Sequence, residues 1–129
     1  MEKVGKIFDR VVLDTDCLVQ LEKGDISIIE FLDRSGILFI TSISVFEFAL
    51  GELFNEKDTR LEDYTVIPFN KQDGLLAAKM FKKLRKSGME LEFRDVMIAS
   101  ICINNKIPLL TRNKKHFERF KEDGLILVG

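Results

Sequence analysis

Short apolar runs alternate with longer amphipathic stretches along this chain. The runs predict strands at about residues 10–14, 37–40, 65–69, 107–110 and 125–128, because apolar and β-branched residues dominate them. Apolar residues at helical spacing predict helices over residues 16–22, 25–34, 73–87, 93–104 and 116–120, and one that starts at Ser44. The charged residues 55–63 predict a loop. Strands that alternate with helices indicate an α/β fold of three layers, α/β/α, around a mostly parallel sheet of about five strands.

Capping residues and glycine predict where some of the helices begin and end. Asp25 is a good cap for the second helix, and Gly36 is expected to end it. Thr41 and Ser42 predict a turn before the helix that Ser44 caps.

Length and charge limit the classes of protein to consider. A chain of 129 residues predicts one domain spanning residues 1–129. Its composition, 46% apolar and 32% charged, excludes a disordered chain. The net charge of −1 gives no overall attraction to nucleic acid, so any such binding must come from local clusters.

The cysteines and the apolar content bear on localisation. Cys17 and Cys102 lie in apolar runs without nearby metal-ligating partners, which argues against a zinc site and favours a reducing interior. No run of about 18 apolar residues predicts a membrane span, and the first residues lack the apolar core of a signal peptide. We therefore expect a cytoplasmic protein that does not bind membranes.

Three acidic residues stand out because their surroundings are apolar. Asp14 follows the first strand, Glu47 lies between two phenylalanines, and Asp95 opens a mostly apolar helix. In open α/β sheets, ligands bind outside the carboxyl ends of the strands, where Asp14 is expected. Carboxylates are hard oxygen ligands that suit Mg²⁺ or Mn²⁺. If the three acids converge, they predict a site for such an ion.

Each acid also has a purely structural interpretation. Asp14 can simply cap a helix, Glu47 can be the capping-box partner of Ser44, and Asp95 can be an ordinary acid in the first turn of a helix. These interpretations remain open from the residues alone.

Four stretches, in order, resemble the motifs of a known family. They are residues 13–16 (LDTD), 41–51 (TSISVFEFALG), 94–100 (RDVMIAS) and 110–118 (LTRNKKHFE). The first resembles a strand-end L-D-T-N/D motif, the third a D-x-x-I-A-A motif, and the last a T-R-N/D-x-x-H/D-F motif. The chain thus resembles the PIN-domain nucleases, in their toxin-type (VapC-like) group of prokaryotic ribonucleases. The resemblance implies a single PIN-like domain over residues 1–129.

The resemblance also implies an activity and its residues. It implies an Mg²⁺- or Mn²⁺-dependent endoribonuclease, the toxin of a toxin–antitoxin pair, with a small antitoxin protein as partner and a homodimeric state. The implied catalytic residues are Asp14, Glu47, Asp95 and Asn113, the first three of them as metal ligands. Asn113 stands where many members have a fourth aspartate. Supporting roles fall to Thr15, Asp16 and Thr111.

A basic group flanks Asn113 in the sequence. It comprises Arg112, Lys114, Lys115 and His116, which are candidates to neutralise RNA phosphates. The same residues also fit the solvated start of a helix, and His116 fits either a general base or a residue packed near Phe117.

Two other functions fit parts of the pattern. Asp14 and Asp16 after a strand also match the start of an aspartyl-phosphate phosphatase, in which Asp14 would be the nucleophile. Alternatively, the chain is a PIN-fold interaction module, with weak or no catalysis, that binds RNA or protein. Titration with divalent metal separates the enzymes from the module, because only the enzymes are expected to bind the ion.

Overall fold

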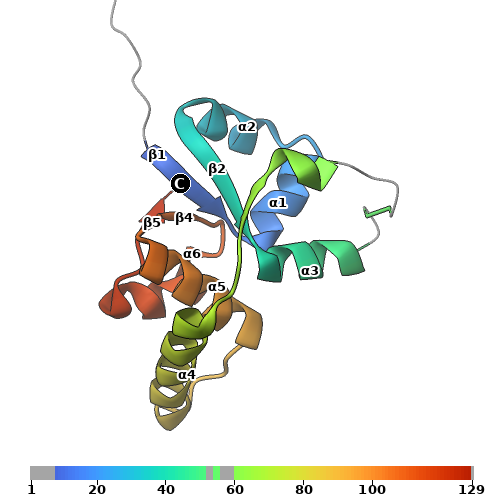
Figure 1. Cartoon of the computed structure of the whole chain (residues 1–129). Coiled ribbons are helices and arrows are strands. Elements are labelled where there is room, and N and C mark those ends of the chain that lie inside the picture. The colour runs from blue at the N-terminus through green and yellow to red at the C-terminus, as the bar shows by residue number, and fades with distance from the viewer. Residues whose placement is uncertain (1–7, 52–53, 56–59, 129) are drawn as a thin grey trace, which may run out of the picture.

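A single parallel sheet organises the molecule. The computed structural model describes residues 8–51, 54–55 and 60–128 (Figure 1). Within them the sheet has the order β3-β2-β1-β4-β5, and all four strand pairings are parallel. The strands are β1 (Phe8–Leu13), β2 (Ser35–Thr41), β3 (Thr65–Ile67), β4 (Leu109–Leu110) and β5 (Leu127–Val128). Because all strands run the same way, their carboxyl ends lie along one edge of the sheet.

Helices cover both faces of this sheet, which confirms the predicted three-layer α/β/α fold (Figure 1). The helices are α1 (Thr15–Glu22), α2 (Ile26–Asp33), α3 (Ser42–Leu50), α4 (Lys71–Lys86), α5 (Phe93–Asn105) and α6 (Lys114–Phe117), with 3₁₀ turns η1 (Arg60–Asp63) and η2 (Glu118–Asp123). Strand residues alternate between the two layers. Val12 packs into the core beneath α4 and α5, whereas Val11 and Leu13 pack into the core beneath α1 and α3.

The start of α3 differs from the prediction. The helix begins at Ser42, and the side chain of Thr41 caps it by accepting a hydrogen bond from the Ser44 backbone N–H at 3.1 Å. Ser44 is fully buried inside the first turn. The predicted turn at Thr41 and Ser42, and the predicted cap at Ser44, are therefore wrong, because Thr41 ends β2 and caps the helix directly.

The boundary between α2 and β2 also differs. Asp25 caps α2 as predicted, but the helix ends at Asp33 and Ser35 already belongs to β2. Gly36 therefore lies inside the strand and is not a helix stop. A Cβ atom at Gly36 would lie 2.1 Å from the backbone oxygen of Asp9, so this position needs glycine for the close approach of β1.

Several other boundaries shift by a few residues. Helix α4 begins earlier than predicted, because Asn70 and Asp73 form a reciprocal capping box at its start. The last two strands are shorter than predicted, and Ile107 is buried in the loop that precedes β4. The predicted helix 116–120 is α6 followed by η2. Of the predicted loop 55–63, residues 60–63 form η1 and residues 56–59 lie outside the described part.

None of the described helices combines the length and the apolar content needed to cross a bilayer.

Candidate active site

A polar hollow of about 160 Å³ lies beyond the carboxyl end of β1. It is lined by Asp14, Thr15, Asp16, Glu47, Asp95, Asn113 and Phe117. These residues come from four separate segments: the β1–α1 junction, α3, the first turn of α5, and the region from the end of β4 through α6. The structure thus places the three acids singled out in the sequence, together with Asn113, around one cavity.

Asp14 is held by two hydrogen bonds at the start of α1. Its Oδ1 accepts from the backbone N–H of Cys17 at 2.8 Å, and its Oδ2 accepts from the hydroxyl of Thr111 at 2.5 Å. The residue is only 4% exposed, and this burial raises the pKa of the Asp14 carboxyl, although the bonds from Thr111 and Cys17 oppose the shift. Asp14 therefore caps a helix and lines the hollow at the same time.

Glu47 is oriented by a hydroxyl from another helix. The Thr15 hydroxyl donates to Glu47 Oε1 at 2.7 Å and lies 3.0 Å from the Ser44 hydroxyl. Since Ser44 is inside the helix and does not cap it, the capping-box interpretation of Ser44 and Glu47 is wrong. Glu47 is instead bonded directly to α1, and both Thr15 and Glu47 line the hollow.

Asp95 is the third residue of α5 and pairs with His116. Its Oδ2 lies 2.7 Å from Nε2 of His116, so this histidine contacts a site acid and not a core group alone. Burial raises the pKa of Asp95; His116 lowers it, and the nearby charges of Glu47, Glu92 and Asp14 raise it. The Asp95 carboxyl is therefore influenced by the charges of the other acids that line the hollow.

The side chains of the basic group that flanks Asn113 do not gather at one place in the structure. Arg112 binds Asp25 Oδ2 at 2.6 Å and the Ser27 hydroxyl, so it reaches the start of α2 and not the hollow. This guanidinium holds the pKa of Asp25 well below its usual range. Lys114 and Lys115 are exposed and do not line the hollow.

Arg94 is a basic residue at the site that sequence reasoning did not single out. Its guanidinium lies 3.0 Å from Glu92 and 3.7 Å from Oε2 of Glu47. The only signal in the sequence is its position directly before Asp95, which is weak because charged residues are common in the first turn of a helix.

Whether a divalent metal fits this site depends on the oxygen atoms around the hollow. Carboxylate oxygens around a small polar hollow suit Mg²⁺ or Mn²⁺ chemically. However, no three aspartate, glutamate, histidine or cysteine side chains of the described residues form a group that could hold a metal as they stand. In this arrangement Asp14, Glu47 and Asp95 are each bonded to a different neighbour: Thr111, Thr15 and His116, respectively.

Comparisons with known sequences point to one family. A sequence model described as the PIN domain matches residues 11–123. The protein named Ribonuclease VapC1 of Methanocaldococcus jannaschii is 30% identical over 128 residues, which cover 96% of this chain and 90% of that protein. The protein named Ribonuclease VapC1 of Rickettsia felis is 25% identical, and the match covers 86% of this chain and 90% of that protein.

Solved structures show the same fold. The crystal structure of VapBC2 from Rickettsia felis, bound to a DNA fragment from the promoter, contains a chain that matches with a TM-score of 0.77 and 25% identity over 92% of this chain and 97% of that one. A chain in the structure of VapBC-1 from nontypeable Haemophilus influenzae matches with a TM-score of 0.77 and 26% identity over 92% of this chain and 96% of that one.

Proposed function

The chain belongs to the PIN domain family, and on this premise we propose that it is an endoribonuclease and the toxin of a toxin–antitoxin pair. The observation that carries the proposal is the hollow at which Asp14, Glu47, Asp95 and Asn113 meet from four segments. The names of the similar proteins, Ribonuclease VapC1, support RNA as the substrate. The phosphatase alternative gains no support from the family.

Activity is proposed to require Mg²⁺ or Mn²⁺, which Asp14, Glu47 and Asp95 would hold. Such an ion, when bound, polarises a phosphate oxygen and lowers the pKa of a water molecule. The chain itself does the positioning. Thr111 donates to Asp14 and Thr15 donates to Glu47, so each hydroxyl fixes the direction of one carboxylate.

The remaining lining residues have more modest proposed roles. Asp16 adds a negative charge at the exposed edge of the hollow. Asn113 offers a neutral amide oxygen, so this site has one charge fewer than relatives with a fourth aspartate. Arg94 lies beside Glu47 and is the cation best placed to bind a substrate phosphate entering the hollow.

An assay on structured RNAs, with and without a chelator, tests this function. We expect wild-type cleavage to stop when the chelator is added. Asp14→Asn, Glu47→Gln and Asp95→Asn are each expected to lower the rate at least about 100-fold, because a ligand matters more than its outer partners. Asp33→Asn, an exposed acid of α2, is the matched control.

The interaction-module alternative is favoured by one observation, namely that no three acids are arranged as a metal group among the described residues. Calorimetric titration with Mn²⁺ separates the two functions. The nuclease predicts binding that Asp95→Asn weakens, whereas the module predicts none. Undiminished RNA cleavage by Asp95→Asn would exclude this residue from the site.

A small antitoxin protein is the proposed partner. The support is that the similar chains in the Rickettsia and Haemophilus structures belong to VapBC assemblies. We expect a short reading frame beside the gene, whose product co-purifies with this chain and blocks RNA cleavage. A neighbourhood without such a frame would count against the antitoxin and not against the nuclease.

A homodimer is also proposed, from exposed apolar side chains on two helices. Ile26 of α2 is 69% exposed, and Phe46 and Leu50 of α3 are 57% and 68% exposed. Burial of such side chains drives association. Sedimentation at micromolar concentration is expected to show a dimer that Leu50→Asp converts to a monomer.

A further inference from the structure

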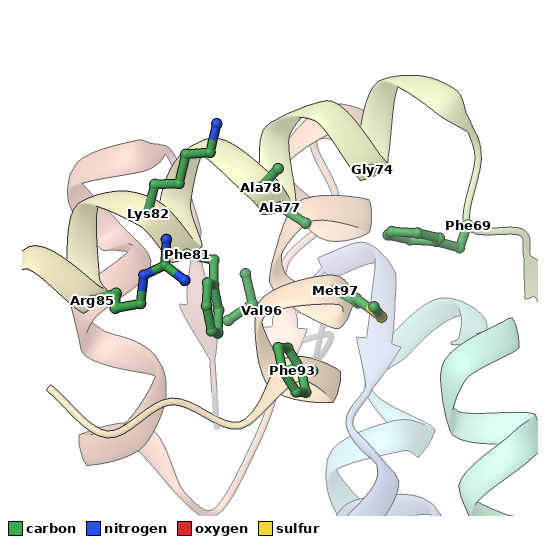
Figure 2. A pocket seen from close by; sticks show the side chains of 10 residues that line it. All are labelled: Phe69, Gly74, Ala77, Ala78, Phe81, Lys82, Arg85, Phe93, Val96 and Met97. Carbon is green, nitrogen blue, oxygen red and sulfur yellow. The ribbon is translucent and has the colours of Figure 1, made fainter.

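A second cavity, unlike the polar hollow, lies between α4 and α5. It has a volume of about 390 Å³ and an almost entirely apolar lining. Figure 2 shows Phe69 at one end, Arg85 at the other, and the side chains of Phe81, Val96 and Phe93 between them. Nothing in the proposed nuclease mechanism uses this pocket.

The pocket presents flat aromatic surface to solvent. The rings of Phe81 and Phe93 stack with their centroids 5.1 Å apart and an interplanar angle of 19°. Phe93 is nevertheless 62% exposed, although it is one of the larger apolar side chains. Leaving apolar area in water costs about 25 cal/mol per Å². An exposed aromatic ring at the wall of a cavity is therefore a candidate contact for a ligand.

The charge at the pocket is positive. Lys82 and Arg85 lie at its rim, and no carboxylate is among the residues that line it. Arg85 lies over the ring of Phe81, 5.6 Å from its centroid, and neither cation makes an ion pair within the described residues. The pocket thus complements a ligand that combines a flat aromatic group with a negative charge.

The pocket and the polar hollow share the first turn of α5. Phe93 lines the pocket, Asp95 lines the hollow, and Arg94 lies between them in sequence and contacts Glu47. Two residues of a helix rise by about 3 Å along its axis. At about 3.6 residues per turn, positions 93 and 95 point to opposite sides of α5, so the pocket and the hollow open on different sides of its first turn. A strand of RNA with one phosphate in the hollow would reach the pocket by passing around this turn.

We propose that the α4–α5 pocket binds one nucleobase of the single-stranded RNA whose scissile phosphate lies in the hollow. The base stacks on Phe93, and Lys82 and Arg85 bind the phosphate of the same nucleotide. Stacking on aromatic side chains combined with cations along the backbone is the general mode by which single strands are bound. This proposal rests on the proposed nuclease function, since it needs RNA in the hollow.

The absence of tryptophan from the sequence gives a direct test. Phe93→Trp introduces a unique fluorophore, and combining it with Asp95→Asn keeps the RNA intact. A single-stranded oligonucleotide of about ten nucleotides, which fits the usual site sizes, is titrated into this variant. We expect saturable quenching of the fluorescence, and no quenching by the same oligonucleotide with abasic sites.

Two sets of substitutions test the parts of the pocket separately. Phe93→Ala is expected to weaken oligonucleotide binding about tenfold, and Phe93→Tyr to retain it. The double variant Lys82→Ala, Arg85→Ala is expected to reduce the slope of log affinity against log salt by about 0.7, for one phosphate on a single strand. Lys79→Ala with Lys86→Ala, two exposed cations of α4 outside the pocket, is expected to leave the slope unchanged.

The outcomes separate this proposal from the nuclease. If the wild type cleaves RNA and Phe93→Ala cleaves it with the same kcat/KM, the pocket proposal is wrong and the nuclease stands. If the wild type does not cleave RNA, the nuclease is wrong, and absence of quenching then overturns the pocket as well. Quenching by an acidic peptide with one aromatic residue, but not by the oligonucleotide, would overturn the proposal in favour of a protein ligand. Thermal melting of Phe93→Ala checks that the fold is intact.

Discussion

At the scale of single residues, Asp14 combines a structural task with its place in the hollow. Its two oxygens hold the start of α1 and the hydroxyl of Thr111, while its charge is almost completely buried. A buried carboxylate is costly, and here the hydrogen bonds offset only part of the cost, because the pKa remains raised. The buried carboxylate of Asp14 therefore lowers the stability of the fold at the position where the proposed cation would bind.

Asp14→Asn is expected to stabilise the metal-free protein at pH 7 by about 1 kcal/mol, within the range found when functional residues are relaxed. The asparagine oxygen can still accept from Cys17, and its amide can donate to Thr111, so the cap survives without the buried charge. Urea unfolding in the presence of a chelator measures the change.

The stability difference between the wild type and Asp14→Asn is expected to change with pH in a definite direction. Because the pKa of Asp14 is raised in the folded state, the folded protein binds this proton more tightly than the unfolded chain does. The wild type therefore recovers stability from this group as the pH falls through its folded pKa toward the lower pKa of the unfolded chain, and the advantage of Asp14→Asn shrinks. An advantage that grew at lower pH would contradict the burial argument.

The sequence predicted these site residues unequally. Asp14, Glu47 and Asp95 could be singled out because a charge in apolar surroundings is visible in the sequence. Arg94, and the bond from Thr15 to Glu47, could not, because both depend on which helices the fold brings together. Arg112 was predicted to face phosphate, but in the structure it binds Asp25, a partner 87 residues away. The catalytic roles of the lining residues remain predictions.

At the scale of elements, the contact between β1 and β2 depends on one glycine. Gly36→Ala is expected to destabilise the fold by about 1–3 kcal/mol, the usual cost of forcing atoms into a tight contact, because the new Cβ would meet the backbone of Asp9. Gly74→Ala is the matched control. Its Cβ would lie 3.8 Å from the ring of Phe69, an ordinary contact, and alanine is the better helix former in α4 by about 1 kcal/mol.

Urea unfolding of both glycine variants compares the two elements. We expect the midpoint to fall for Gly36→Ala and to rise or stay unchanged for Gly74→Ala. A similar loss in both variants would indicate that the β1–β2 contact is not special.

The ion pair between Arg112 and Asp25 joins the segment after β4 to the start of α2. Since that segment also carries Thr111 and Asn113, we expect the pair to hold it in place beside the hollow. Arg112→Met and Asp25→Asn are each expected to lower kcat about tenfold, at the lower end of losses seen when an outer partner of a site is removed. An asparagine at position 25 can still cap α2.

Comparison of these two variants identifies the role of Arg112. If Arg112 positions the segment, both variants lower kcat with little change in KM. If Arg112 instead binds RNA phosphate, only Arg112→Met is impaired, and the loss is in KM. RNA cleavage kinetics at several substrate concentrations distinguish the two results.

The helices and strands were predictable from the spacing of apolar residues, but some of their first and last residues were not. Asp25 was correctly predicted as a helix cap because aspartate before an apolar periodic run is a strong local signal. The start of α3 was misplaced because Thr41, Ser42 and Ser44 are all good caps, and only the end of β2 decides among them. Gly36 was predicted to end a helix because the sequence alone does not distinguish a glycine in a turn from a glycine in a crowded strand.

At the scale of the whole molecule, alternation of strands and helices sufficed to predict the layers. The order of the strands was not predicted, and it is what makes the hollow: β1 lies between β2 and β4, so the segments after all three strands adjoin. The α4–α5 pocket was also not predictable from the sequence, because the contact between Phe81 and Phe93 depends on how α4 and α5 pack together. That residues 1–129 form one domain stays a prediction.

The order in which the segments are made determines when the proposed site can assemble. Asp14 and Glu47 are synthesised first, whereas Asp95 and the strand that pairs with β1 on its other side follow about 50 residues or more after Glu47. Domains fold as units, so the proposed set of acids comes together only after β4 has been made. A nascent chain that ends before β4 is therefore expected to have no complete site.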